Sequence, residues 1–243
     1  FGVINSLNTS LGPDSPTDFE AGGLEFRHYV VNADAQRLFD VAFLPLPLSV
    51  AFGFEYRDER YEVKAGEPAS YIQGDFPGAA GSQVFPGFQP SNETVGDRDS
   101  VAVYAELDTD VTLNWNVSVA GRFEDYSDFG STTNGKLATR FQATDYLAIR
   151  GAVSSGFRAP SLQQQFFTST ATNFIDGIPS EVGTFPVESD VALALGATPL
   201  DAEESFNASA GIVLQPTPDL NLTFDFYRIK LNDRVVPVSY KHL

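Results

Sequence analysis

The sequence contains no cysteine and only two histidines, His28 and His242. Without cysteine there is no disulfide frame, no thiolate nucleophile and no cysteine-based zinc site. The two histidines lie far apart in sequence, so a histidine metal site or a histidine base is not expected. A nucleophile elbow, a Walker loop, a dinucleotide-binding glycine pattern and a zinc-protease motif are all missing. The sequence therefore predicts no enzyme, and no catalytic, cofactor-binding or metal-binding site.

Basic residues are also scarce. Lysine and arginine together number 15 against 32 aspartates and glutamates, which gives a formal net charge of -17. A nucleic-acid groove needs clustered lysine and arginine. This composition argues against nucleic acid as a partner.

Long apolar runs are missing as well. The mean hydropathy is -0.11, and no run approaches the roughly 18 residues that a membrane-spanning helix needs. Hydropathy alone would indicate a soluble protein. It does not exclude a membrane β-barrel, because only every second residue of such a strand is apolar.

The sequence is rich in strands with a two-residue period. In residues 48–56 the even positions are all apolar, whereas the odd positions are small or charged. A similar alternation recurs, less cleanly in the first range, in residues 24–39, 48–62, 101–107, 113–123, 136–141, 147–154, 206–214 and 220–226. We therefore expect an all-β fold of about eight antiparallel strands. The other face of these strands is mostly Ser, Ala, Gly, Asn and Thr, which favours a lipid-facing apolar band over the core of a soluble sandwich.

The connections between these strands alternate in length. Short connections are expected at 44–47, 108–112, 143–146 and 215–219, and long ones at 63–98, 127–134 and 157–204. Short turns at one end and long loops at the other are typical of an outer-membrane barrel. The sequence thus predicts an antiparallel up-and-down transmembrane β-barrel.

Four segments resemble a known family. They are "AFGFEYRDERYEVKAGEP" (51–68), "GRFEDYSDFGSTTNGKLATRF" (121–141), "LAIRGAVSSGFRAPSLQQQF" (147–166) and "LDAEESFNASAGIVLQPTPDLNLTFDFYRIKLNDRVV" (200–236). In this order they resemble the barrel of TonB-dependent outer-membrane receptors. That family has a barrel of 22 strands, so the resemblance implies that residues 1–243 are a partial barrel domain of about eight strands. Nothing resembles the plug domain of the family, and we expect an interior piece of the barrel.

The resemblance also implies a function. Members import a bulky nutrient such as a ferric siderophore, vitamin B12 or an oligosaccharide across the outer membrane of Gram-negative bacteria. Expected partners are outer-membrane lipid, the ligand, and the TonB energy-coupling protein, which acts through a plug domain that this sequence lacks. Two alternatives remain open: a small passive outer-membrane barrel or porin, and a soluble β-sandwich binding module.

Charged residues on the face opposite the apolar one are the candidate site. Arg122, Lys136, Arg140 and Arg150 come from three consecutive predicted strands and should face the lumen, with Glu106 and Glu124 supplying part of the balancing charge. They could form a salt-bridge ladder or a path for anionic ligands. Arg158 follows a strand and is a candidate extracellular loop contact, either to a ligand or to a neighbouring acidic loop.

Overall fold

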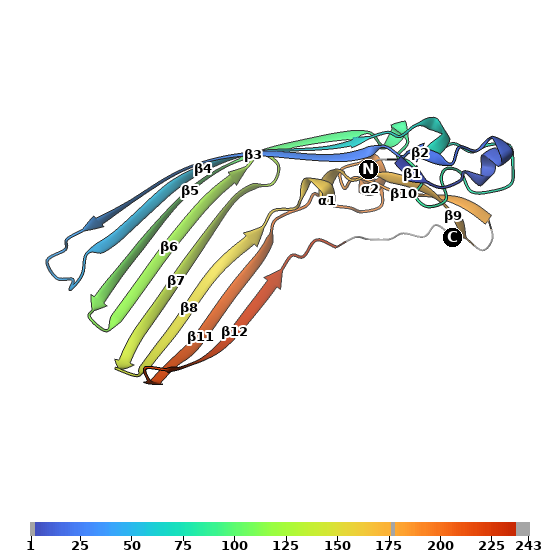
Figure 1. Cartoon of the computed structure of the whole chain (residues 1–243). Coiled ribbons are helices and arrows are strands. Elements are labelled where there is room, and N and C mark those ends of the chain that lie inside the picture. Colours follow the sequence, from blue (N-terminus) through green and yellow to red (C-terminus); the bar gives the residue numbers. More distant parts are fainter. Residues whose placement is uncertain (1–2, 176–177, 237–243) are drawn as a thin grey trace. The chain divides into compact units, whose positions relative to one another are not determined.

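The structure, a computed structural model of the chain, describes residues 3–175 and 178–236. Strands dominate it (Figure 1). In chain order the strands are β1 (Val3–Asn5), β2 (Asp18–Glu20), β3 (Gly23–Phe39), β4 (Leu48–Lys64), β5 (Thr94–Thr112), β6 (Trp115–Tyr126), β7 (Gly130–Thr144), β8 (Leu147–Arg158), β9 (Ser169–Ile175), β10 (Ile178–Thr184), β11 (Glu203–Thr217) and β12 (Leu220–Asn232). Two short α-helices, α1 (Leu162–Phe166) and α2 (Asp190–Ala194), and three 3-10 turns, η1 (Thr9–Asp14), η2 (Pro68–Ser70) and η3 (Pro90–Asn92), complete the chain. No helix of the described ranges is both long and apolar enough to cross a membrane.

Eight of the strands form a single sheet in the order β12-β11-β8-β7-β6-β5-β4-β3. Neighbours in the sheet are also neighbours along the chain, except that the β9–β10 hairpin is inserted between β8 and β11. The registered pairs from β5 to β12 are antiparallel. Within the described residues the sheet ends at β3 and β12 and does not close. The expected all-β, up-and-down architecture with about eight strands is confirmed.

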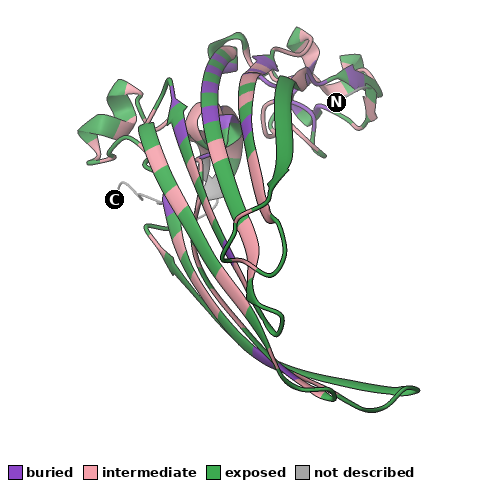
Figure 2. Ribbon diagram, turned by 90° about the vertical axis from the view of Figure 1, so that its left-hand side faces the viewer, coloured by how far each residue is buried: buried purple, intermediate pink, exposed green. Residues whose placement is uncertain are grey.

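The register places the alternating residues on two distinct faces, because directly opposite residues of paired strands point to the same side. One row runs through Leu107, Val119, Leu137 and Val153. We call this side the apolar face, and its exposed members include Val103, Leu107, Val119, Phe123, Leu137, Phe141, Ile149, Val153, Ile212 and Phe224. The other side, the polar face, carries Tyr104, Glu106, Ser118, Arg122, Lys136, Arg140, Arg150, Gly211 and Asp225. Most of the sheet is exposed or half-buried (Figure 2).

The chain divides into two compact units. One comprises residues 30–57, 99–160 and 201–243 and contains most of the sheet. The other comprises residues 1–29, 58–98 and 161–200 and contains the remaining ends of β3, β4 and β5 with the loops. The loop-bearing unit has a small core in which Tyr61, Val63, Phe88 and Leu162 are each at most 3% exposed.

The segment after β8 contributes to that core. Ser161 caps α1 by accepting the N–H of Gln164, and Leu162 is 1% exposed. Phe166 lies against Gly96 of β5, where an added Cβ would come within 2.2 Å of its ring. The Phe167 ring meets the Phe88 ring edge to face, with a centroid distance of 6.2 Å. This segment is therefore anchored in the unit's core.

One expected long connection is wrong. Residues 127–134 were expected to form a loop, but β6 ends at Tyr126 and β7 already begins at Gly130. Gly130 takes a positive φ of 91°, and the Tyr126 ring stacks on Phe129 at 4.6 Å. Glycine permits this tight turn because it has no Cβ. The two other long connections are confirmed as long, although they hold short helices and the β9–β10 hairpin rather than structureless chain.

Candidate functional site on the polar face of the sheet

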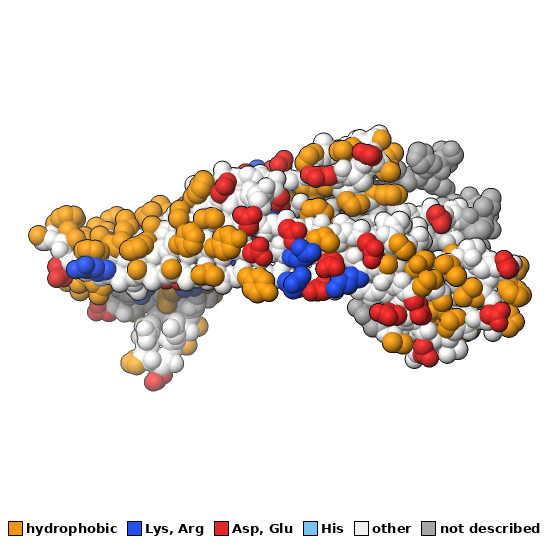
Figure 3. Space-filling view, turned by 90° about the horizontal axis from the view of Figure 1, so that it is seen from above, with side chains coloured by type: hydrophobic (Ala, Val, Ile, Leu, Met, Phe, Trp, Pro, Cys, Tyr) orange, Lys and Arg blue, Asp and Glu red, His pale blue; other side chains and the backbone are white. Residues whose placement is uncertain are grey.

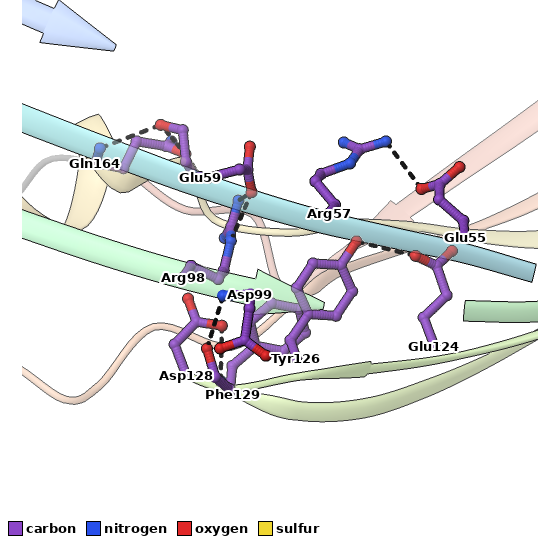
Figure 4. Close-up of polar contacts among 12 residues, drawn as sticks. Glu55, Arg57, Glu59, Arg98, Asp99, Glu124, Tyr126, Asp128, Phe129 and Gln164 are labelled. Carbon is purple, nitrogen blue, oxygen red and sulfur yellow. Dashed lines mark hydrogen bonds and ion pairs between the residues drawn. The ribbon is translucent and has the colours of Figure 1, made fainter. Parts of the chain in front are cut away.

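Arg122 on β6 is the centre of a cluster of charged side chains. Its Nε donates to Glu124 Oε1 at 2.5 Å, and its Nη2 donates to Glu55 Oε1 at 3.2 Å. Glu55 also accepts from Arg57, and Glu124 accepts from the hydroxyl of Tyr126 at 3.0 Å (Figure 4). Two carboxylates thus share one guanidinium on a half-buried face, where charge-assisted hydrogen bonds are stronger than neutral ones.

Aromatic and hydroxyl groups extend this cluster along the same face. The Arg122 guanidinium lies over the Tyr104 ring at 5.1 Å, within the range of a cation–π interaction. The Tyr104 hydroxyl donates to Asp34 on β3. Glu106 accepts from the hydroxyl of Ser118 at 2.9 Å. Glu106 and Glu124 therefore lie on the same face, but only Glu124 contacts Arg122.

Arg150 has a different partner, which the sequence argument did not include. Its Nε and Nη2 donate to the two carboxylate oxygens of Asp225 at 3.0 and 2.6 Å. Arg150 is on β8 and Asp225 on β12, and Gly211 of β11 is directly opposite both. A Cβ on Gly211 would come within 2.1 Å of Asp225 Oδ1. The ion pair can pass over Gly211 because this residue has no side chain.

Arg140 and Lys136 on β7 differ from the other two cations. Arg140 is directly opposite Arg150 and donates to Gln142 Oε1 at 2.6 Å. Within the described ranges neither Arg140 nor Lys136 has a carboxylate within 4.0 Å. Arg140 also borders a shallow hollow of about 320 Å³ lined in addition by Gln142, Asp145, Tyr146, Ala148, Val213 and Gln215. Asp145 thus shares the hollow with Arg140 without forming an ion pair, and neither Arg140 nor Lys136 is held by a carboxylate on this face.

Arg158 lies at the last position of β8. Its Nε and Nη2 donate to Glu203, the first residue of β11, at 2.8 and 2.7 Å. Glu203 Oε1 also accepts the N–H of Val235 at 2.8 Å. The bond from Arg158, and then the one from Val235, lower the pKa of Glu203 below its ordinary value. Glu203 thus connects the end of β8, the start of β11 and the segment that follows β12.

The loop-bearing unit has its own buried ion pair. Arg98 donates to Glu59 Oε2 through Nη2 at 2.5 Å and through Nε at 2.8 Å (Figure 4). The two side chains are only 5% and 11% exposed. Removing one partner of such a pair leaves a buried charge uncompensated and is strongly destabilising. We therefore assign this pair to the structure of the unit.

Sequence reasoning found four basic residues of the polar face, Arg122, Lys136, Arg140 and Arg150, but missed Arg57 and several carboxylate partners. Asp225 could have been found, because it is the only carboxylate on the polar positions of residues 220–226. Asp34 and Glu55 gave no such signal, since their pairing with Tyr104 and Arg122 depends on the order of the strands. This arrangement holds the charged side chains in place on the polar face of the sheet, where the cations can bind an anion.

A family model described as TonB dependent receptor-like, beta-barrel matches residues 3–241. The chain belongs to this family. It is therefore part of an outer-membrane protein of a Gram-negative bacterium, as expected from the four segments quoted above. The apolar face is the side that contacts lipid in such a barrel.

Relatives of the chain include a probable TonB-dependent siderophore receptor, PirA, of Acinetobacter baumannii. It is 27% identical over 196 residues, which is 79% of this chain and 24% of that protein. The structure of PirA from Pseudomonas aeruginosa is similar with a TM-score of 0.64 at 17% identity, over 90% of this chain and 35% of that one. A mutant of the ferric enterobactin receptor PfeA of Pseudomonas aeruginosa, solved in complex with enterobactin, has a TM-score of 0.60 at 13% identity over 94% of this chain and 30% of that one. The chain thus spans about a quarter of the curated relative, and the structural matches show the fold alone.

Proposed function

We propose that residues 1–243 are a partial barrel domain of an energy-coupled outer-membrane receptor that imports a bulky nutrient. The observation that carries the proposal is the eight-stranded up-and-down sheet whose apolar face has no charged residue within residues 115–123, 131–141, 147–157 and 206–214. A ferric siderophore is the first candidate ligand, because PirA is named as a siderophore receptor and PfeA was solved with enterobactin. Vitamin B12 and oligosaccharides are further candidates. We expect transport, not catalysis.

In this proposal the polar face lines the lumen. Arg122 and Arg150 with their carboxylate partners would stiffen the wall as a salt-bridge ladder, whereas Arg140 and Lys136 would remain available to an anionic group. Arg158 would support an extracellular loop through Glu203. A plug domain elsewhere in the intact protein would pass the force from the TonB protein to the ligand site.

An uptake experiment tests the proposal. Cells that carry the full-length protein should accumulate iron-55 from ferric enterobactin at low concentration, and a protonophore or deletion of the TonB protein should abolish the uptake. A passive barrel would show uptake that persists without energy and rises linearly with concentration. Persistent, non-saturable uptake would therefore favour the porin alternative.

A labelling experiment tests the assignment of the faces. The sequence has no cysteine, so Arg122→Cys, Arg140→Cys and Val119→Cys can each be introduced singly into the full-length protein. A lipid-soluble thiol reagent should label the variant at position 119 and spare the other two. Strong labelling from the lipid phase at positions 122 and 140, with none at 119, would mean that the barrel is oriented the other way round.

A further inference from the structure

The alternation of apolar and polar residues inverts halfway along β12. Up to Phe226 the even-numbered residues are apolar, but from Tyr227 onward the odd-numbered ones are: Tyr227, Ile229 and Leu231. A β-bulge would explain such an inversion by turning the strand over. The register excludes one here, because the pairing of β11 with β12 is continuous from Glu204↔Asn232 to Leu214↔Leu222.

Two cations consequently lie on the apolar face. Arg228 is directly opposite Ala208, and Lys230 is directly opposite Phe206. Ala208 in turn is opposite Val153, so the row that begins with Val119 and Leu137 ends in Arg228. The apolar-face positions of residues 115–123, 131–141, 147–157 and 206–214 contain no charged residue.

Because the strands are tilted, the residues of one cross-strand row lie at different heights in the membrane. A row of lipid-facing residues can therefore end in a cation. Val119 is only four residues from the start of β6, whereas Arg228 is eight and Lys230 ten residues from the start of β12. At about 3.3 Å per residue and a tilt of about 40°, Arg228 lies roughly 20 Å and Lys230 roughly 25 Å above the short turn. The apolar band of such a barrel is about 25 Å tall. Both cations therefore reach the outer border of the membrane, where long basic side chains extend toward the headgroups.

Neither cation is neutralised by a described neighbour. Both side chains are exposed, and no carboxylate of residues 3–175 or 178–236 lies within 4.0 Å of either. On the same face, the residue of β11 that follows Phe206 outward is Glu204, which is two residues farther along the strand and opposite Asn232. Arginine at the middle of the bilayer costs about 2–4 kcal/mol, but it costs almost nothing at the interface. Arg228 and Lys230 are therefore tolerated at this height, and their donor groups lie on the face that contacts lipid.

We propose that Arg228 and Lys230 form a binding site on the outer wall of the barrel for the phosphate of an anionic membrane lipid. Arginine offers a planar fork of donors that fits a phosphate, and the adjacent lysine adds a point charge. The lipid source is chosen over a soluble phosphate because the site lies on the face that contacts lipid, with Phe226 and Phe206 directly below and beside it. The proposal rests on the membrane location of the family and is independent of which nutrient is imported.

The test compares two double variants of the full-length protein. R228Q/K230Q removes both cations from the apolar face, and K136Q/R140Q removes the same charge from the polar face. Native mass spectrometry of the detergent-solubilised protein follows titration with phosphatidic acid or with phosphatidylcholine of equal chain length. Heat-modifiable migration on gels verifies that each variant is folded.

We expect the wild type to prefer phosphatidic acid and R228Q/K230Q to bind it about 5- to 25-fold more weakly, at roughly fivefold for each basic residue. K136Q/R140Q should keep the wild-type affinity. An unchanged affinity in R228Q/K230Q, or an equal loss in both variants, would overturn the proposal. Displacement of the lipid by inorganic phosphate at the same concentration would instead identify a soluble anion as the ligand and also overturn it. Iron uptake is scored separately, so failure here leaves the transport proposal untouched.

Discussion

Arg150 and Asp225 pair across an intervening strand. Their strands, β8 and β12, are not neighbours in the sheet, and the two hydrogen bonds of 2.6 and 3.0 Å pass over Gly211 of β11. A Cβ at position 211 would lie 2.1 Å from Asp225 Oδ1 and 3.0 Å from Arg150 Nε. The ion pair between β8 and β12 therefore requires a glycine at position 211 of β11.

The first prediction follows from this geometry. Gly211→Ala should separate Arg150 from Asp225 and lower the free energy of unfolding by about 1–3 kcal/mol through overpacking. In the background of Asp225→Ala the same substitution should cost much less, because the clashing carboxylate is gone. Urea unfolding of the full-length protein in lipid vesicles measures both. Gly151→Ala is the control, since its Cβ would meet only Ser209 O at an ordinary 3.5 Å; equal losses at 151 and 211 would contradict the argument.

The second prediction concerns the lipid-facing row. Val119→Arg should destabilise the barrel by about 2–4 kcal/mol, because it places a charge against the hydrocarbon core. Ser118→Arg should cost less, because Ser118 is on the polar face and already contacts Glu106 at 2.9 Å. Folding into vesicles at a series of urea concentrations gives both values. Equal tolerance at the two positions would count against a membrane-facing row.

The third prediction uses the lowered pKa of Glu203. A group whose pKa is lower in the folded than in the unfolded protein stabilises the fold above the ordinary carboxylate pKa and loses this effect as the pH falls through the lowered value. Hydrogen exchange at the Val235 amide, which donates to Glu203, should therefore speed up as the pH falls through the acid range, after correction for intrinsic exchange.

Two variants control this measurement. Glu203→Gln should remove most of the acid-dependent part, whereas Glu204→Gln, which has no ion pair among the described residues, should retain it. Identical profiles for wild type and Glu203→Gln would show that the Arg158–Glu203 pair does not hold this segment.

The fourth prediction concerns the loop-bearing unit. Leu162 is 1% exposed and packs in the cluster with Tyr61, Val63 and Phe88, so Leu162→Ala should cost about 2–5 kcal/mol through lost burial and a cavity. Limited proteolysis should then cut residues 161–200 faster, while the sheet stays intact. Leu193→Ala on α2, where the side chain is 46% exposed, should leave the cutting rate unchanged.

Strand existence and the two faces of the sheet could be predicted from the sequence, because a two-residue period forces alternate side chains to opposite sides. Residues 101–107 and 115–123 show this well, since Val101, Val103, Leu107, Val119 and Phe123 all lie on the apolar face. The length of the β6–β7 connection could not be predicted. Asp125 to Gly135 reads as a polar loop, yet cross-strand bonds extend β6 and β7 until only Ser127, Asp128 and Phe129 remain between them.

The sequence by itself determined the strand pattern, the face on which Arg122, Lys136, Arg140 and Arg150 lie, and the family to which the chain belongs. The tertiary structure decided which partner each charge has. Asp34, Glu55 and Asp225 are tens of residues away from the side chains they bind, and strand order and register bring them together. The structure also decided that Arg228 and Lys230 lie on the apolar face. Alternation in the sequence defines two faces, but only the pairing of β12 with β11 shows to which face the residues after Phe226 belong.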